Sequence, residues 1–479
     1  MTNLNPRTAH ALDPRDQRIT ELEAQVRQRD AQVAELQQKL ADLQERLAEL
    51  ERASKRQAAP FARKKHKEHR KRPGRKAGQG KFASRVRPTP EQVTETKAVV
   101  LKRCPDCGGR LQDRKTHEQF VIDIPEALPT VTRSVTHSGR CAHCRKRVRS
   151  HHPEQISQAT GAAGVVIGPR AKALVADWKH RLGISYAKVA EMLEVAFGLP
   201  FTRGGMCQAD TRLALRQARP IYDELVALIR QSAVVHTDET GWRIGVLAAW
   251  LWVFTQRHVT VYTIRTSRGH EVVLDILGHA FRGTLVSDCF TAYDHAALDD
   301  WLKQKCVGHL LKDLSGIRET KTRGAVRLAQ DITALLRAAL ALRDQKPILA
   351  AKVFQAQVAA LEQRLDQLID PDRRLTDPEN QRFAKRLRKH RDHLLRFLYT
   401  DGLDPTNNQA ERRLRPAVIT RKTGGCNRNE RGALTHAILA SLLVTCRQQG
   451  LPILEALVKI QRAAHANPRL LRLPQLAAP

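Results

Sequence analysis

Residues 233–294 decide the fold, and they read AVVHTDETGWRIGVLAAWLWVFTQRHVTVYTIRTSRGHEVVLDILGHAFRGTLVSDCFTAYD. Three runs rich in β-branched and aromatic residues, at 233–238, 249–255 and 259–264, are joined by short polar turns. This pattern predicts a three-stranded meander. A helix over about 269–277 and a fourth strand over 283–287 should follow.

Three strands, a helix and a fourth strand follow one another in the order of an RNase H-like α/β sheet. In that sheet the ends of the first and fourth strands are neighbours. Asp238 and Asp288 stand at those two strand ends, 50 positions apart. Hard oxygen ligands suit Mg²⁺, so the two carboxylates could share one metal ion.

The chain then continues with helical stripes, such as Ile332, Leu335 and Leu336, which predict an inserted helical hairpin. After it, Thr406 and Gln409 have the spacing of a capping box. The box places Glu411 on the first turns of a helix that should end or kink at Pro416. Asn407, Glu411 and Arg415 would then share one helix face.

Composition indicates a polyanionic partner. The 479 residues contain 82 Lys and Arg against 49 Asp and Glu, a net charge of +33. The length predicts about three domains. The longest apolar stretches, such as 437–444, are shorter than the roughly 20 residues that span a membrane. The N-terminus lacks the apolar core of a secretory signal, so a reducing cytoplasmic location is expected and the nine cysteines should be thiols or metal ligands.

The N-terminal region reads as a coiled coil. Between residues 19 and 50, apolar residues recur in a seven-residue frame that only Arg29 interrupts. Such a stripe predicts a seam buried by a partner helix, and self-association is the simplest partner. A single amphipathic helix that folds back on its own chain is the alternative.

Residues 55–87 contain 14 Lys or Arg and one acid. A stretch so charged cannot bury a core and predicts a flexible basic linker. Arg72, Arg75 and Lys76 resemble the Arg-rich arms that enter the minor groove of DNA. A solvated spacer is the alternative.

Two CxxC knuckles follow the linker. They comprise Cys104 and Cys107, then Cys141 and Cys144. Four thiolates complete the closed tetrahedral shell of one structural Zn²⁺ ion in a zinc ribbon. Two unrelated thiol pairs, or a redox pair, are the alternatives.

Residues 168–230 read as helices, with breaks at Gly183 and at 198–200 and a third helix from about Arg203. A helix-turn-helix would place that third helix in a major groove of DNA. Ordinary helical packing explains the same pattern equally well.

Three sequence blocks carry a resemblance to a known family. They are His236-Thr237-Asp238-Glu239-Thr240, the stretch from Ser287-Asp288 to Tyr293-Asp294, and Asn407-Asn408-Gln409-Ala410-Glu411-Arg412. In this order they resemble the catalytic blocks of the insertion-sequence 66 family of bacterial DDE transposases. The zipper-like N-terminus, basic stretch and double CxxC are similar to family members too, so the likeness covers most of residues 16–450.

The resemblance implies a transposase that binds the ends of its mobile element and cuts and joins DNA strands. It implies a metal-binding triad of Asp238, Asp288 and Glu411 and DNA contacts by basic residues around the third block: Arg412, Arg415, Arg421 and Lys422. Expected partners are the double-stranded DNA of the element ends and target, further copies of the chain, and accessory proteins of the same element. Such an enzyme would associate with the bacterial nucleoid.

Two departures from the family limit what the resemblance transfers. Where members commonly have Cys-Trp-x-His and a basic pair, this chain has Cys306-Val307-Gly308-His309 and Leu-Leu-Lys. His309 is a candidate to support the metal site or to contact the scissile phosphate, or else an ordinary core or surface histidine. After Lys422, residues 423–426 replace an expected aromatic-containing stretch, so recognition of DNA ends should differ.

Two-metal chemistry explains why three carboxylates are needed. Two Mg²⁺ or Mn²⁺ ions roughly 3.5 to 4 Å apart activate the attacking oxygen and stabilise the leaving oxygen of a phosphate. Glu239, Asp294 and Asp313 should be ordinary capping or pairing acids. The alternative functions are a non-catalytic DNA-binding regulator, an inactivated transposase remnant and a structure-specific nuclease.

The expected organisation comprises nine segments. They are a disordered N-terminus (1–15), a coiled coil (16–54), a basic linker (55–92), a zinc-binding domain (93–152), a helical region (153–230), a first catalytic part (231–320), a helical insertion (321–401), a second catalytic part (402–450) and a C-terminal tail (451–479).

Overall fold

The computed structural model describes residues 14–55, 86–113, 115–152 and 154–466. Most of the expected basic linker, including Arg72, Arg75 and Lys76, lies outside the described residues. In the described part of the chain, no helix is both long and apolar enough to cross a membrane.

The centre of the molecule is a five-stranded mixed sheet. Its strand order is β5 (Thr260–Arg265), β4 (Leu247–Thr255), β3 (Val234–Ile244), β6 (Thr284–Ser287) and β7 (Leu302–Lys305). The predicted meander is confirmed, because β3, β4 and β5 pair antiparallel. The predicted fourth strand is β6, which pairs parallel to β3, and it is followed by β7, which the sequence analysis did not predict.

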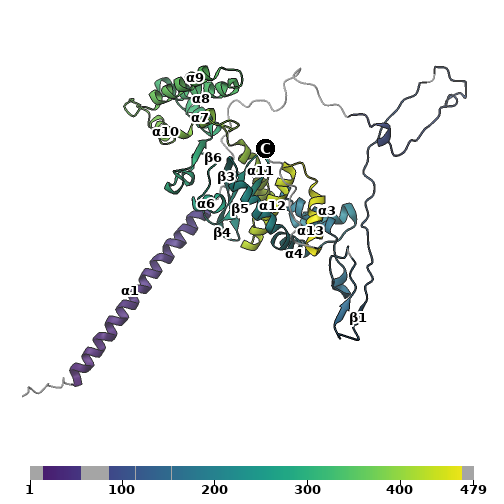
Figure 1. The fold of residues 1–479 in the computed structure, drawn as a ribbon, viewed down its shortest axis with the longest axis horizontal. Coiled ribbons are helices and arrows are strands. Elements are labelled where there is room, and N and C mark those ends of the chain that lie inside the picture. Colours follow the sequence, from purple (N-terminus) through teal and green to yellow (C-terminus); the bar gives the residue numbers. More distant parts are fainter. Residues whose placement is uncertain (1–13, 56–85, 114, 153, 467–479) are drawn as a thin grey trace, which may run out of the picture.

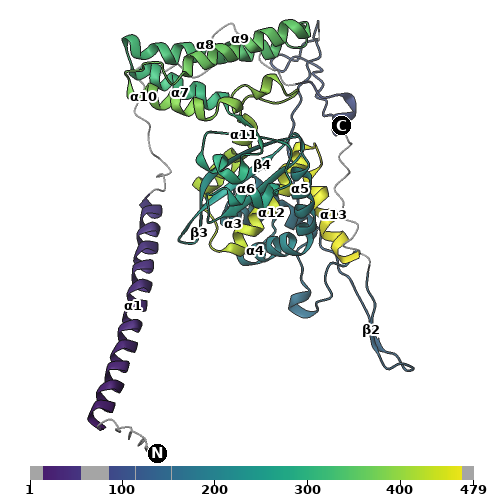
Figure 2. The ribbon, with the colours of Figure 1, turned by 60° about the vertical axis from the view of Figure 1, so that its left-hand side comes forward.

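Both faces of the sheet are buried. Trp252 and Phe254 of β4 belong to one core cluster, whereas the alternating Leu251 and Val253 belong to another. The first cluster includes α5 (Arg219–Arg230) and α6 (Glu271–Leu277), and the second includes α11 (Asn408–Gly424). The apolar helix α12 (Glu430–Gln448) contributes side chains to both clusters. The sheet is therefore enclosed by helices, as Figures 1 and 2 show.

The predicted helical insertion is present. Helices α8 (Arg327–Gln345) and α9 (Ala351–Ile369) form a hairpin that packs with α7 (Val307–Thr320) and α10 (Pro378–Lys389). Figure 2 shows these four helices as a separate layer beside the sheet. The layer has its own apolar core, which includes Leu335, Leu336 and Leu365.

The helical region before the sheet follows the expected breaks. It contains α2 (Pro169–Ala176), α3 (Tyr186–Phe197) and α4 (Arg203–Arg212). The side chains of Ser185 and Thr202 cap the N-termini of α3 and α4, and α3 ends at a left-handed Gly198. A small core of Val175, Val189, Leu193 and Met206 joins the three helices.

Two N-terminal segments expose most of their surface. Helix α1 (Pro14–Lys55) extends away from the sheet in Figure 1, and six of its apolar side chains between Leu22 and Leu43 are 45–64% exposed. None of the described residues from 86 to 152 is buried, and their only strands are β1 (Ser138–Arg140) and β2 (Arg147–Arg149).

The expected C-terminal tail contains a packed helix, α13 (Ile453–Ala466). Leu457 and Ile460 are buried in the main core cluster. Their spacing gives the segment an apolar stripe, so the prediction of a plain tail missed a helix.

Candidate active site

The first two acids stand on neighbouring strands. Asp288 directly follows the end of β6, whereas Asp238 lies inside β3, which runs on to Ile244 instead of ending at residue 238 as expected, because residues 239–244 continue the pairing with β4. Strands β3 and β6 pair in parallel from Val234 opposite Thr284 to His236 opposite Val286, a constant offset of 50 positions. The same offset relates Asp238 to Asp288, just beyond the paired segment. Asp238 and Asp288 are therefore neighbours across the β3–β6 pair, as the strand order predicted, although only Asp288 is at a strand end.

The start of α7 is fixed against this edge. Cys306 is the N-cap of α7, and its backbone N–H donates to the carbonyl of Ser287 at 2.8 Å. The next residue, Val307, donates its backbone N–H to the carbonyl of Pro405 at 2.9 Å. One helix start thus connects the end of β6 to the segment that precedes α11.

Asn407, the N-cap of α11, completes the connection. Its buried side-chain amide donates to the carbonyl of Thr237 at 2.8 Å, directly before Asp238. Its backbone N–H donates to the sulfur of Cys306 at 3.1 Å. These bonds bring the first turn of α11 to the middle of β3 and to the residues that follow the end of β6.

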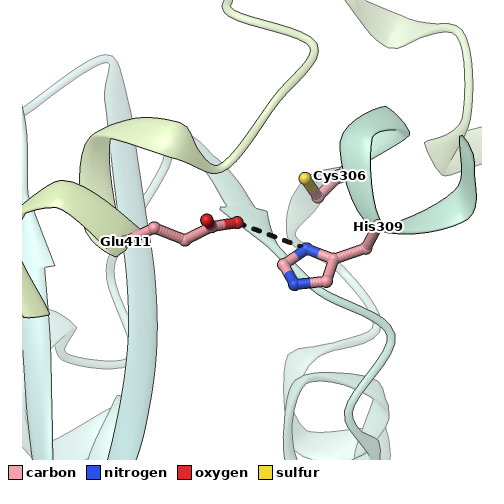
Figure 3. Close-up of side chains that lie close together, drawn as sticks. All are labelled: Cys306, His309 and Glu411. Atoms are coloured by element: carbon pink, nitrogen blue, oxygen red, sulfur yellow. Dashed lines mark ion pairs between the residues drawn. The ribbon is translucent and has the colours of Figure 1, made fainter. Parts of the chain in front are cut away.

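Glu411 lies on that first turn and faces α7. Its Oε1 atom is 3.7 Å from Nδ1 of His309, and Figure 3 shows the two side chains pointing toward each other beneath Cys306. The structure therefore assembles the three sequence blocks, with His309, at one place.

The structure differs from two details expected for this helix, its capping box and its end at Pro416. Thr406 does not form a capping box with Gln409: its backbone N–H and hydroxyl both donate to Asp404 at 2.8 Å, and Asn407 occupies the N-cap position without a side-chain capping bond. Pro416 does not end the helix, which runs on to Gly424. Tertiary packing of Leu414 and Ala417 in the core offsets the lost backbone hydrogen bond.

The electrostatics of the site favour a bound cation. Burial, followed by the charges of Glu239 and Asp288, raises the pKa of Asp238 to about 7. Contact with the Cys306 sulfur, together with Glu411 and Asp288, raises the pKa of His309 to about 9. Clustered, partly buried carboxylates repel one another, and a divalent cation would relieve that repulsion. The carboxylate oxygens of Asp238, Asp288 and Glu411 are ligands of the kind that Mg²⁺ and Mn²⁺ prefer, but in the described part of the chain these three carboxylates do not all lie within 4.8 Å of one another.

Neighbouring acids have structural partners. Glu239 binds Arg268 at 2.8 Å and accepts a hydrogen bond from the Tyr293 hydroxyl at 2.5 Å. Asp294 pairs with the buried Lys305 at 2.7 Å. Asp313 pairs with Arg386 at 2.8 Å. The expectation that these three acids are pairing residues is confirmed.

Comparison with known proteins identifies the family. The model of the family described as "Transposase IS66 family" matches residues 164–435, which is more than half of the chain and includes all three blocks. The chain belongs to the IS66 transposase family. The resemblance stated from the three blocks is thus confirmed.

A curated relative is more distant. This IS66-family chain is 24% identical over 298 residues to "Uncharacterized protein y4qI" of Sinorhizobium fredii (strain NBRC 101917 / NGR234). The matched region is 55% of this chain and 54% of that protein, so the chain spans about half the length of the curated relative it matches.

The expected DNA-contacting residues of this IS66-family chain differ in their exposure to solvent and in their contacts within the protein. Arg412, Arg415 and Lys422 are exposed on α11. Arg421 is half-buried, and its guanidinium donates to the carbonyl of Gly241 and to the Thr240 hydroxyl. Arg421 therefore anchors α11 to β3 in this structure.

Each expected zinc knuckle forms a tight turn. The N–H of Cys104 donates to Gly109 at 3.0 Å, and that of Cys141 donates to Lys146 at 2.9 Å. Backbone N–H groups within each turn lower the pKa of Cys104 and of Cys141, which favours thiolates. The four sulfurs do not come together at metal-binding spacing among the described residues. The zinc ribbon stays a prediction.

Sequence reasoning missed three contributors to the site. Cys306 was considered only as part of a family motif, and Asn407 only as one of three residues that share a helix face. Lys305, fully buried, donates to the Asp288 carbonyl at 3.1 Å and was not singled out. The Cys-x-x-His spacing at the start of a helix was the one available signal.

Proposed function

We propose that this IS66-family protein is a DDE transposase with an RNase H-like catalytic domain, in which Asp238, Asp288 and Glu411 hold two Mg²⁺ or Mn²⁺ ions. The observation that carries the proposal is the convergence of the three blocks through the β3–β6 pairing and the Asn407 hydrogen bond to Thr237. The strand order β5-β4-β3-β6-β7 supports the RNase H-like assignment.

All three carboxylates serve as metal ligands in this scheme. Asp238 on β3, Asp288 directly after β6 and Glu411 on α11 would together hold the ions. The ions supply activation of the attacking oxygen and stabilisation of the leaving oxygen. His309 lies beside Glu411 and is positioned to contact an oxygen of the scissile phosphate.

The reaction needs no covalent bond between protein and DNA. Attack of water on a phosphodiester at the element end releases a 3′-hydroxyl, which then attacks a phosphodiester of the target DNA. The three carboxylates have the same role in both steps, because the attacking oxygen and the leaving oxygen are arranged in the same way around the phosphorus. The protein contributes orientation and charge, which dominate phosphoryl transfer.

The remaining modules would assemble and grip the DNA. The exposed apolar stripe of α1 would form a coiled coil with another copy, so that two element ends meet in one complex. Four cysteines would hold one structural Zn²⁺. Helix α4, the basic linker with Arg72, Arg75 and Lys76, and the exposed Arg412, Arg415 and Lys422 would contact DNA.

Cleavage and joining of a plasmid that carries the native flanking DNA test this proposal. Full-length protein is incubated with Mg²⁺, and Asp238→Asn and Asp288→Asn variants are compared at equal zinc content. Asp313→Asn is the matched control, because Asp313 pairs with Arg386 away from the three blocks. Binding of the flanking DNA is measured in parallel.

Joined products from the wild type and Asp313→Asn, with DNA binding but no products from the other two variants, are expected. Specific binding without cleavage in Mg²⁺ or Mn²⁺, even with accessory proteins of the same locus, would instead support a regulator or an inactive remnant. Cleavage without joining would support a nuclease.

A further inference from the structure

A mixed set of metal ligands adjoins the three-carboxylate site. Cys306, His309 and Glu411 each place one ligand atom so that the three atoms lie within 4.8 Å of one another. In the described part of the chain, this is the one such group of three His, Cys, Asp or Glu side chains. Figure 3 shows that two ligands come from the start of α7 and the third from α11.

The arrangement is close to that of a bound ion. Cys306 and His309 are three positions apart, so they share one face of the first turn of α7. Ligands about 2.1 Å from a tetrahedral Zn²⁺ ion are separated by about 3.4 Å. The His309 Nδ1 to Glu411 Oε1 separation is 3.7 Å, so a small side-chain adjustment would reach that geometry.

Two of the ligand atoms have surroundings that suit coordination. Nδ1 of His309 is buried and has no well-aligned hydrogen-bond partner. The Cys306 sulfur is buried and accepts a hydrogen bond from the backbone N–H of Asn407 at 3.1 Å. An N–H that points at sulfur stabilises the thiolate form, which is the form that binds metals.

The ligand chemistry separates this group from the Mg²⁺ site. Sulfur and imidazole nitrogen favour Zn²⁺ and similar ions, whereas Mg²⁺ takes oxygen ligands. Three protein ligands leave the fourth position of a tetrahedral Zn²⁺ ion open to water or a phosphate oxygen. Glu411 belongs to both groups, so a Zn²⁺ ion held by Cys306 and His309 would compete with Mg²⁺ for the oxygens of its carboxylate.

We propose that Cys306, His309 and Glu411 bind one Zn²⁺ ion and that this ion withdraws Glu411 from the catalytic carboxylates, so that Zn²⁺ inhibits Mg²⁺-dependent strand cleavage. Zinc binding stands independently, while its inhibitory effect rests on the proposed function. Binding forms Zn–S, Zn–N and Zn–O bonds, and the protons of the thiol and of any protonated imidazole pass to solvent.

A zinc count tests the site without any enzymatic readout. Full-length wild type is dialysed to equilibrium against chelator-buffered Zn²⁺, and bound zinc per chain is measured. Cys306→Ser should bind one zinc fewer than the wild type. Serine oxygen still accepts the Asn407 N–H, so the fold should persist. Cys207→Ser is the matched control, because Cys207 is an exposed thiol on α4 outside the group.

His309→Gln is the second ligand variant and should lose the same zinc. Thermal unfolding of each variant checks that it is folded. Equal zinc in the wild type, Cys306→Ser and His309→Gln would overturn the site, whatever the protein does to DNA.

Inhibition is tested by adding Zn²⁺ to the cleavage assay at fixed Mg²⁺. The concentration of free Zn²⁺ for half inhibition should rise by about tenfold or more in Cys306→Ser, each protein being compared with its own zinc-free rate. The same half-inhibition concentration in both proteins would overturn the inhibitory role. A wild type that never cleaves in Mg²⁺ would contradict the proposed function, and the zinc count would still decide the site.

Discussion

Replacing Asn407 with alanine should disable the site without removing any carboxylate. The Asn407 amide donates to the Thr237 carbonyl at 2.8 Å, and the side chain is completely buried. Loss of a partner for a buried carbonyl costs about 1–3 kcal/mol. We therefore expect the free energy of unfolding to fall by that amount.

The effect on strand cleavage should be larger than the effect on stability. Asn407 precedes the helix turn that holds Glu411, and the bond from its side-chain amide to β3 sets the position of that turn next to Asp238. A displacement of about 1 Å in a catalytic group can lower a rate by about 10²-fold. We expect a loss of that order in Mg²⁺-dependent cleavage by Asn407→Ala, with DNA binding retained.

The adjacent Asn408 provides the matched control. Its side chain is exposed on the same helix, so Asn408→Ala should change stability by less than about 0.5 kcal/mol. Urea unfolding and plasmid cleavage are measured for both variants. Equal stability and equal cleavage in Asn407→Ala and Asn408→Ala would refute the assignment of Asn407 as the residue that positions α11.

Three further outcomes are expected. Burial, then repulsion by Lys303 and Lys305, lowers the pKa of His393 to about 4. Its contribution to stability is therefore present above the unfolded pKa of about 6.5 and is lost as pH falls toward 4. His393→Gln should make the free energy of unfolding in urea depend less on pH across that range, and an unchanged pH dependence would contradict this. Lys305→Met should destabilise the fold by about 3 kcal/mol because it removes the nearest cation of Asp294, which keeps Lys389 at 3.1 Å and His390 at 3.6 Å as further partners. Denaturant unfolding in which the added Asp294→Asn change recovers no stability would argue against the pair. Leu36→Lys in the apolar stripe of α1 should weaken self-association in sedimentation experiments, whereas Gln38→Lys on the outer face of α1 should not. Equal effects of the two changes on self-association would contradict the proposed coiled coil.

The sheet could be predicted from sequence because its strands follow simple rules. Strands β4 and β5 are rich in β-branched and aromatic residues, β3 begins with such a run at Val234 and Val235, and β6 is a short run that Asp288 directly follows. The second half of β3, residues 239–244, was not predicted because Glu239, Gly241 and Arg243 interrupt the pattern. The order of the strands along the chain was enough to place Asp238 beside Asp288. The position of Glu411 depended on the family resemblance, because nothing in its local sequence indicates which sheet edge the helix meets.

Strand β7 shows why other parts could not be predicted. Its sequence is Leu-Lys-Gln-Lys, yet Lys303, Gln304 and Lys305 are only 2%, 0% and 0% exposed. Their burial is offset by partners that are remote in sequence, such as Asp294 for Lys305 and the Leu394 carbonyl for Gln304. A hydrophobic pattern predicts which apolar side chains are buried. It cannot predict the burial of polar side chains whose hydrogen-bond or ion-pair partners are distant in sequence.

The hydrogen bond between Val307 and Pro405 has a consequence for how members of such a family can diverge in size. It closes the chain on itself at the point where the helical insertion leaves the sheet and returns to it. Doubling the length of a closed loop costs only about 0.6 kcal/mol. Helices α8, α9 and α10 could therefore be exchanged for a larger domain or a short linker while Asp288 and Glu411 keep their separation, which makes this joint a natural graft point for engineering.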